Sequence, residues 1–282
     1  MDRPGEQPAR TGRARAVRLR SGSYGLITVL LGLAAAAFFA LPLLGVFLKG
    51  DLRHGLDTET TREAFRVTAE TSAASLAAML IVGTPVAYRL ATTAFRGRTV
   101  LVTLFELPLV LPPAVAGIGL FAAFGRTGLL GGQLSALGIE LPFTAAAVVM
   151  AMTFVAGPLY LRQAQASFGA VDRDLLAAAR TLGAGPWKVF LQVAVPLAGP
   201  GLGAGAALAW ARAVGEFGAT IMFAGSLEGV TQTAPIATYL QFEQGDFGAA
   251  LALGATLIAV SGVVLLAVKL IIRGRTLRFG PM

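Results

Sequence analysis

Two opposite charges lie four residues apart inside a long apolar run. Arg212 and Glu216 are the only charged side chains in residues 199–223. On a helix this spacing places both on one face, and charges inside a bilayer are costly unless they are paired or functional. An ion pair is the simpler prediction. The alternative is that Arg212 offers positive potential to a passing dianion while Glu216 holds the guanidinium in place.

Three prolines occupy a second apolar run, residues 100–124. Pro108, Pro112 and Pro113 lack a backbone N–H and interrupt helical hydrogen bonding, which a membrane tolerates where the freed groups are buried in protein or line water. The run is therefore predicted to line a cavity, although a packed kink with no transport role fits the same residues. Glu106 beside this break would repel an anion, so we expect it to be paired or structural.

Weak hydrogen-bond donors gather in the segment that follows the Arg–Glu pair. Thr220, Thr231, Gln232 and Thr233 supply hydroxyls and an amide, groups that can hold an oxyanion in transit without trapping it. Residues 224–246 contain no Lys or Arg. We predict that this stretch lies outside the cell, where it either faces an external partner or forms a solvated loop.

The side chains required for catalysis or metal binding are scarce. The chain has no cysteine, which excludes disulfides, thiolate metal sites and cysteine nucleophiles, and its one histidine, His54, has no second metal ligand nearby in sequence. No Ser/His/Asp set is evident, and no G-x-x-x-x-G-K-[ST] phosphate-binding loop occurs. We predict no catalytic residue, metal or cofactor in this chain, so that any ATPase it works with is a separate polypeptide.

The composition is that of a membrane protein. Hydrophobic residues make up 55% of the 282 residues and charged residues only 13%, which is too apolar for a soluble domain of this size. The net charge of +8 comes from short basic clusters beside apolar runs, so no nucleic-acid partner is expected. The bilayer is the predicted environment.

Six apolar runs are candidates to cross the ~30 Å hydrocarbon core as helices, which predicts an all-α integral membrane protein. The spans are expected at about residues 26–47, 69–91, 100–124, 143–161, 199–223 and 247–268. The second is the weakest, because polar residues dilute its apolar centre and Pro85 should bend it. The polar residues are Thr71, Ser72, Ser75 and Thr84.

Glycines recur in the fifth predicted span. Gly199, Gly201, Gly203 and Gly205 include two GxxxG spacings, which allow close approach between membrane helices. Helix packing is the predicted role of these glycines, ahead of substrate contact.

The distribution of basic residues predicts the topology. Seventeen of the 23 Lys and Arg residues lie in segments that are cytoplasmic if the N-terminus is inside, and five lie in the opposite segments. Because positive residues are retained in the cytoplasm, both termini are predicted to be inside. Residues 1–23, with six Arg and no periodic apolar pattern, are predicted to be a disordered cytoplasmic tail, and residues 24–282 the membrane domain.

The longest predicted cytoplasmic connection lies between spans four and five. Asp172 or Asp174 is expected to cap a short helix, residues 175–182, which Gly183 helps to end. An amphipathic segment follows, and Pro196 is expected to close it before the fifth span begins. The helix has a smooth face of alanines that predicts a docking surface, although helices at a membrane surface are a common alternative.

This loop resembles that of ABC importer permeases, which carry the pattern E-A-A, three residues, G, nine residues, I, one residue and L-P. The matching residues are Ala177, Ala178, Ala179, Gly183, Val193, Val195 and Pro196. By resemblance the loop is a coupling helix, seated in a groove of a nucleotide-binding subunit. Ala177 replaces the family's Glu, so an ion pair made by that Glu is absent here.

Further motifs narrow the resemblance to oxyanion permeases. They are LPLVLPP at 107–113, ARTLGAG at 179–185, GEFGAT at 215–220 and TQT at 231–233. Together they resemble the molybdate/tungstate branch of type I ABC permeases, over about residues 65–269. Sulfate permeases share the proline motif and the G-E-[FY]-G core, so the Gly-Ala-Thr continuation and TQT are what favour molybdate.

The resemblance implies an ATP-driven importer in the cytoplasmic (inner) membrane. Its parts would be a homodimer of this permease surrounded by lipid, two ATPase subunits that bind ATP, and an extracytoplasmic oxyanion-binding protein. Sulfate, thiosulfate or tungstate is the alternative cargo. A stand-alone secondary anion transporter is a different class, which would be expected to show an internal repeat with paired broken helices, whereas only one Pro-interrupted span is evident.

Overall fold

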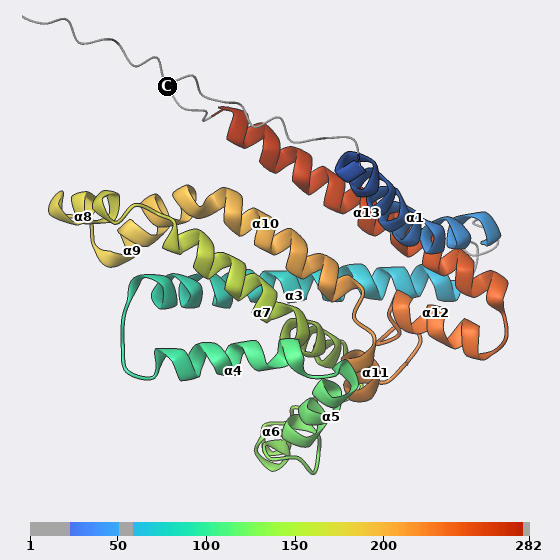
Figure 1. The fold of residues 1–282 in the computed structure, drawn as a ribbon. Coiled ribbons are helices and arrows are strands. Elements are labelled where there is room, and N and C mark those ends of the chain that lie inside the picture. The colour runs from blue at the N-terminus through green and yellow to red at the C-terminus, as the bar shows by residue number, and fades with distance from the viewer. Residues whose placement is uncertain (1–22, 51–58, 279–282) are drawn as a thin grey trace, which may run out of the picture. The chain divides into compact units, whose positions relative to one another are not determined.

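The computed structural model describes residues 23–50 and 59–278 (Figure 1). The regular structure of these residues is helical, as predicted. These described residues divide into two separate compact units, one up to Gly45 and one from Val46 onward. The predicted disordered tail, except for Ser23, and the lone His54 lie outside the described residues.

The helices follow one another with short connections. They are α1 (Ser23–Lys49), α3 (Glu59–Thr92), α4 (Arg98–Val110), α5 (Pro113–Phe124), α6 (Gly131–Ala136), α7 (Ala145–Gly169), α8 (Arg173–Thr181), α9 (Pro186–Val189), the π-helical turn η1 (Phe190–Ala194), α10 (Val195–Val214), α11 (Gly218–Ala224), α12 (Ala234–Glu243) and α13 (Phe247–Arg278).

Among the described residues, five helical segments are long and apolar enough to cross a membrane. They are Leu26–Lys49, Glu59–Thr92, Ala145–Gly169, Pro186–Val214 and Phe247–Ala267. A sixth exists only if α4 and α5, which are bent by 119° at a short break, are counted as one span. The multi-span membrane fold is therefore confirmed, and the prediction of six spans holds in that sense.

The third predicted span, residues 100–124, is not one straight helix. Leu111 and Pro112 each precede a proline and are extended, with ψ of 135° and 133°, because the ring of a following proline disfavours helical geometry. Pro113 then begins α5 at a position where its missing N–H costs nothing. Pro108, by contrast, lies within α4, so the adjacent prolines make the predicted break.

The fifth predicted span, residues 199–223, is also wrong in its bounds. Helical structure runs without a gap from Pro186 to Val214 and then stops, and α11 begins three residues later. Pro196 lies in the first turn of α10, where a helix accepts proline, so it does not close the preceding segment as expected. The break at Gly215 to Phe217 contains no proline, which is why sequence reasoning missed it.

The weakest predicted span packs against three other helices, α7, α10 and α12. α3 is a single helix of 34 residues that continues through Pro85, about 51 Å long and hence longer than the hydrocarbon core. Its polar residues bond to neighbouring helices: Ser75 to Thr153 (3.0 Å), Thr84 to Tyr160 (2.6 Å), and Ser72 from the Trp210 indole (3.2 Å). The polar residues that lower the hydrophobicity of this span are therefore the ones that join α3 to α7 and α10.

α7 lies at the centre of the core, between α3 and α10. Its buried face is built largely of small residues such as Ala147, Ala151 and Ala156, which lets neighbouring helices come close. A Cβ atom added at Gly205 of α10 would lie 2.8 Å from Gln163 Cγ of α7. The predicted packing role of the α10 glycines is therefore seen at Gly205.

Candidate functional site

Arg212 and Glu216 form an ion pair, as predicted. Nη1 of Arg212 lies 2.7 Å from Oε2 of Glu216. The Glu216 side chain is buried, whereas that of Arg212 remains 35% exposed. The pair thus neutralises a buried carboxylate and leaves part of the guanidinium accessible.

Glu216 has a second role in the break between α10 and α11. Its other oxygen, Oε1, accepts a hydrogen bond from the backbone N–H of Ala219 at 2.9 Å. That N–H lies in the first turn of α11, where helical amides have no partner within the helix. One buried carboxylate therefore fixes the end of α10 through Arg212 and the start of α11 through Ala219.

The two broken spans pack against each other through glycines. A Cβ at Gly117 of α5 would lie 2.6 Å from the Ala219 carbonyl oxygen, and one at Gly218 of α11 would lie 2.9 Å from Pro113 Cβ. The proline motif and the GEFGAT motif, which sequence reasoning treated separately, thus form one contact. The available signal was Gly117, four residues after the proline motif, together with Gly218 inside GEFGAT, because such close approach excludes any side chain.

We expect Gly117→Ala to lower the free energy of unfolding by about 1–3 kcal/mol, the usual cost of overpacking. Gly119→Ala on the same helix is the matched control, because nothing lies within 4 Å of its added Cβ. Thermal unfolding of both variants in detergent measures the difference. Equal midpoints for the two would contradict close packing of α5 on α11.

Other predicted pathway residues are placed differently. Pro108 lines a groove of about 530 Å³ between α3, α4 and α7, and the surrounding side chains are almost all apolar. Glu106 lies 3.9 Å from Arg162 in an exposed ion pair, as expected for a paired residue. The groove beside Pro108 therefore has the chemistry of helix packing rather than of anion binding.

The predicted donors after α10 are all buried. Thr231 Oγ1 accepts a hydrogen bond from the Leu227 N–H at 2.9 Å, and Gln232 is 6% exposed. The hydroxyls of Thr220 and Thr233 are buried without a hydrogen-bond partner among the described residues. Two of the four predicted residues thus retain unused hydrogen-bonding capacity.

An aromatic contact covers the break from the side of α12. Phe217 packs on Tyr239, with ring centroids 4.8 Å apart. The Tyr239 hydroxyl donates to Glu243 Oε1 at 2.8 Å, and this bond to a carboxylate raises the pKa of Tyr239 above its ordinary value. Helix α12, which is outside the candidate spans, is thereby attached to the start of α11.

The predicted short helix between spans four and five is α8, and its ends are as expected. Asp172 Oδ1 accepts from the Asp174 N–H at 2.9 Å. At the other end Gly183 has φ of 85°, and the Ala184 N–H bonds back to the Ala179 carbonyl at 3.0 Å. This is the C-terminal arrangement that favours glycine.

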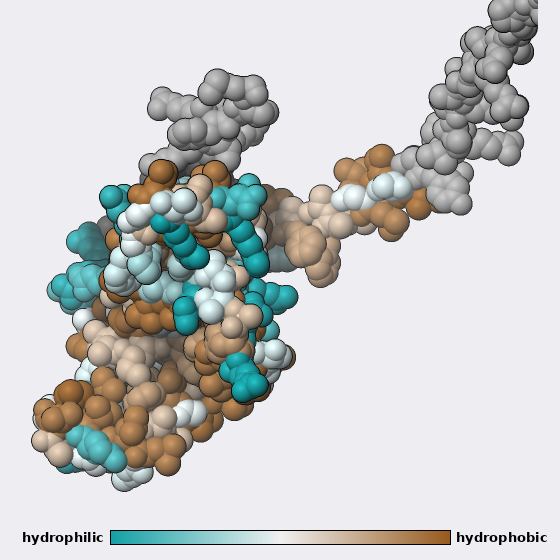
Figure 2. All heavy atoms as spheres, turned by 90° about the vertical axis from the view of Figure 1, so that its left-hand side faces the viewer, coloured by the Kyte–Doolittle hydropathy of each residue, from teal (hydrophilic) through white to brown (hydrophobic). Residues whose placement is uncertain are grey.

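The residues of this loop divide between two surfaces. Ala177, Ala178 and Gly183 are exposed, whereas Val193 and Val195 are partly buried and pack against the core. Figure 2 shows the end of the molecule that carries α8, where hydrophilic side chains are gathered above a largely hydrophobic region. The motif therefore contains an outward surface and an inward anchor.

The anchor is aromatic. Phe190, in the π-helical turn, packs against Tyr88 of α3 and Phe168 of α7, with ring centroids 5.0 and 6.3 Å apart. Trp187 lies 5.3 Å from Phe190 on the outer side. The loop is thus joined to two spans of the core by one phenylalanine that sequence reasoning did not single out.

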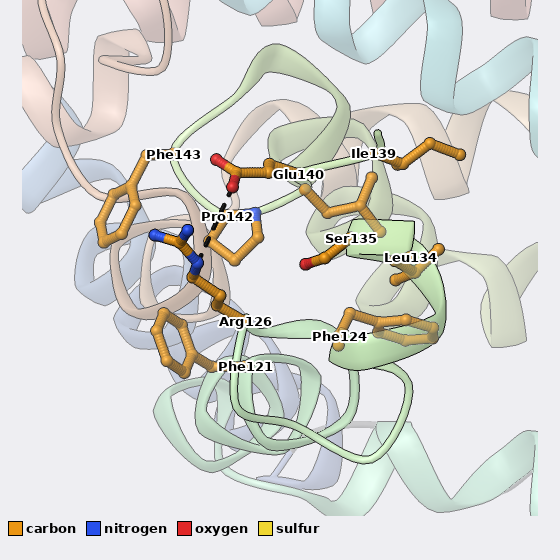
Figure 3. Close-up of a pocket in the computed structure, with 11 residues that line it drawn as sticks. Phe121, Phe124, Arg126, Leu134, Ser135, Ile139, Glu140, Pro142 and Phe143 are labelled. Carbon is orange, nitrogen blue, oxygen red and sulfur yellow. Dashed lines mark ion pairs between the residues drawn. The ribbon is translucent and has the colours of Figure 1, made fainter. Parts of the chain in front are cut away.

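A second hollow, of about 210 Å³, lies in the segment that joins α5 to α7 (Figure 3). Phe121, Phe124 and Phe143 line it, and Arg126 faces Glu140 across it with Nε and Oε1 3.9 Å apart. Phe143 is the one non-glycine residue with positive φ (61°) in the described part of the chain. Among the same residues, no group of three or more His, Cys, Asp or Glu could hold a metal ion.

Residues 80–276 match the model of the family described as "Binding-protein-dependent transport system inner membrane component". The chain belongs to this family. It is 42% identical over 241 residues to the "Molybdenum transport system permease protein ModB" of Mycobacterium tuberculosis, which covers 84% of this chain and 90% of that protein. It is 37% identical to the "Probable molybdenum ABC transporter permease protein" of Haloferax volcanii, covering 92% and 95%.

Solved ABC transporters share the fold. A bacterial transporter involved in the import of the acidic polysaccharide alginate matches with a TM-score of 0.68 at 16% identity, over 89% of this chain and 95% of that chain. The MetNI methionine transporter, in inward-facing conformations, matches with a TM-score of 0.55 at 18% identity, over 79% and 95%. As a member of this family, the chain is a multi-pass permease subunit in the inner membrane.

Proposed function

We propose that this permease moves molybdate across the cytoplasmic membrane as part of an ATP-driven importer. The observation that carries the proposal is the identity of about two residues in five with molybdenum permeases over most of the chain. Tungstate, sulfate and thiosulfate are the alternative cargoes. The structure contains a second broken helix, at Gly215 to Phe217, and paired broken helices are expected of a stand-alone secondary transporter. Membership of a binding-protein-dependent family argues against that class of transporter.

The proposed anion contact is the accessible part of Arg212. The buried carboxylate of Glu216 fixes the orientation of the Arg212 guanidinium. The guanidinium N–H groups that Glu216 does not use would then donate hydrogen bonds to an anion. The unused hydroxyls of Thr220 and Thr233 would add weak donors once the pathway opens. Pro112 and Pro113 would position the break between α10 and α11 by holding α5 against α11. Thr231 and Gln232 would position it by forming the buried connection to α12. A permease must hold its cargo weakly to release it.

Arg212→Gln is expected to lower anion uptake by roughly tenfold or more, the effect of losing a hydrogen bond to a charged group. Uptake and the amount of protein in the membrane should be measured together. The double variant Arg212→Gln/Glu216→Gln separates the two roles, because it removes the unpaired buried carboxylate without restoring the cation. Normal uptake by either variant would show that Arg212 does not contact the anion, and recovery by the double variant alone would show that its role is to pair with Glu216.

The outward surface of α8 is proposed to dock onto a separate ATPase subunit, with both termini of the chain inside the cell. Two ATPase subunits would serve a homodimer of this permease, surrounded by lipid, and an extracytoplasmic binding protein would deliver the anion. ATP binding would close the ATPase pair and carry α8 with it. Phe190 would pass that displacement to α3 and α7, because its ring packs on both.

Gly183→Val should abolish co-purification with the ATPase subunit, because a β-branched residue cannot adopt φ of 85° without strain. Gly185→Val is the matched control: it adds the same side chain two residues away, in equally open space, on a backbone already extended (φ −66°, ψ 163°). Retention of the ATPase by Gly183→Val would contradict the docking proposal.

Competition between sulfate and molybdate for uptake identifies the cargo. In cells that depend on this permease, intracellular molybdenum should not change when sulfate is in large excess, if the pathway discriminates as the molybdenum permeases' names imply. Elemental analysis of washed cells gives the answer. A fall in molybdenum in step with added sulfate would reassign the permease to sulfate.

A further inference from the structure

The segment between α5 and α7, residues 125–142, lies outside the long helices and exposes several large apolar side chains. We call it the outer hairpin; it contains α6. Its largest exposed side chains are Leu129 (83%), Leu137 (74%), Leu130 (45%) and Ile139 (44%). In Figure 1 α5 and α6 project from the bundle of α3, α7 and α10. Such a surface marks contact with another protein or with lipid.

The outer hairpin also contains a preformed hollow. Phe143 closes one side of it, and the Phe143 ring packs against Phe121 with centroids 6.3 Å apart. A Cβ at Gly225 would lie 2.8 Å from the Phe143 ring, so this glycine makes room for it. Positive φ in a phenylalanine costs free energy and persists only when the surroundings fix it, a pattern that concentrates at functional surfaces.

The charges of the outer hairpin favour a partner that carries the same surface. Arg126 and Glu140 are its only charged residues, and their side chains are 82% and 67% exposed although they lie 3.9 Å apart. In a two-fold contact each surface meets its own copy, so one cation and one anion per copy can form two pairs across the axis. A surface at the membrane–water interface typically carries Trp and Tyr with several basic residues, whereas the outer hairpin has no Trp, Tyr or Lys, and Arg126 is its one basic residue.

We propose that the outer hairpin is a contact between two copies of this chain. Arg126 of each copy pairs with Glu140 of the partner subunit, and the exposed leucines cover the partner's hollow. This inference rests on the homodimer of the proposed function and assigns a surface to it.

The test uses two differently tagged chains produced in the same cells, one with Arg126→Glu and the other with Glu140→Arg. Each variant alone has like charges both within the chain and across the proposed contact. Only the mixed pair restores opposite charges between copies, while the pairs within each chain stay repulsive. Mixed dimers should exceed random mixing by roughly fivefold, the effect expected of two surface ion pairs.

Random mixing of the tags in intact dimers would overturn the assigned surface and leave the homodimer standing. Recovery of monomers alone from the wild-type chain would overturn both. A second measurement uses the absence of native cysteines. Leu137→Cys should cross-link two copies through a short bis-maleimide, whereas Leu182→Cys, which is at least as exposed on the α8 loop, should not. Reaction of Leu137→Cys only with a lipid-soluble thiol reagent would identify lipid as the neighbour instead and overturn the proposal.

Discussion

The buried carboxylate of Glu216 determines how the centre of this permease is built. A lone charge there would be strongly unfavourable in a low-dielectric interior, so the chain must supply a cation and a hydrogen-bond donor. Arg212 supplies the first and the Ala219 N–H the second. Because these partners belong to different helices, satisfying the carboxylate sets where α10 ends and α11 begins.

The two breaks in the spans obey one constraint. Backbone groups freed from helical bonding cannot face lipid, and they must be buried in protein or meet water. The helices that follow the breaks, α5 and α11, meet through Gly117 and Gly218, whereas Leu111, Pro112 and Gly215 at the breaks themselves are exposed.

The loop that contains α8 is joined to the core by packing more than by charge. Ala177 stands where the pattern of ABC importer permeases has Glu, and α8 exposes Ala177 and Ala178 beside charged residues such as Arg180. Beneath it, Leu176 is buried and Phe190 is packed between Tyr88 and Phe168. A displacement of this loop is therefore resisted by close-packed side chains, which transmit strain better than exposed ion pairs do.

Local sequence determined the features that depend on neighbouring residues. The apolar runs specified the membrane fold, Asp172 and Gly183 specified the ends of α8, and the spacing of Arg212 and Glu216 specified their pairing, since each involves groups within one or two helical turns. The sequence alone could not reveal that the backbone of Gly117 packs against Ala219, or that the Trp210 indole donates a hydrogen bond to Ser72. Those contacts join residues more than a hundred positions apart, and only the packing of the helices in three dimensions brings them together.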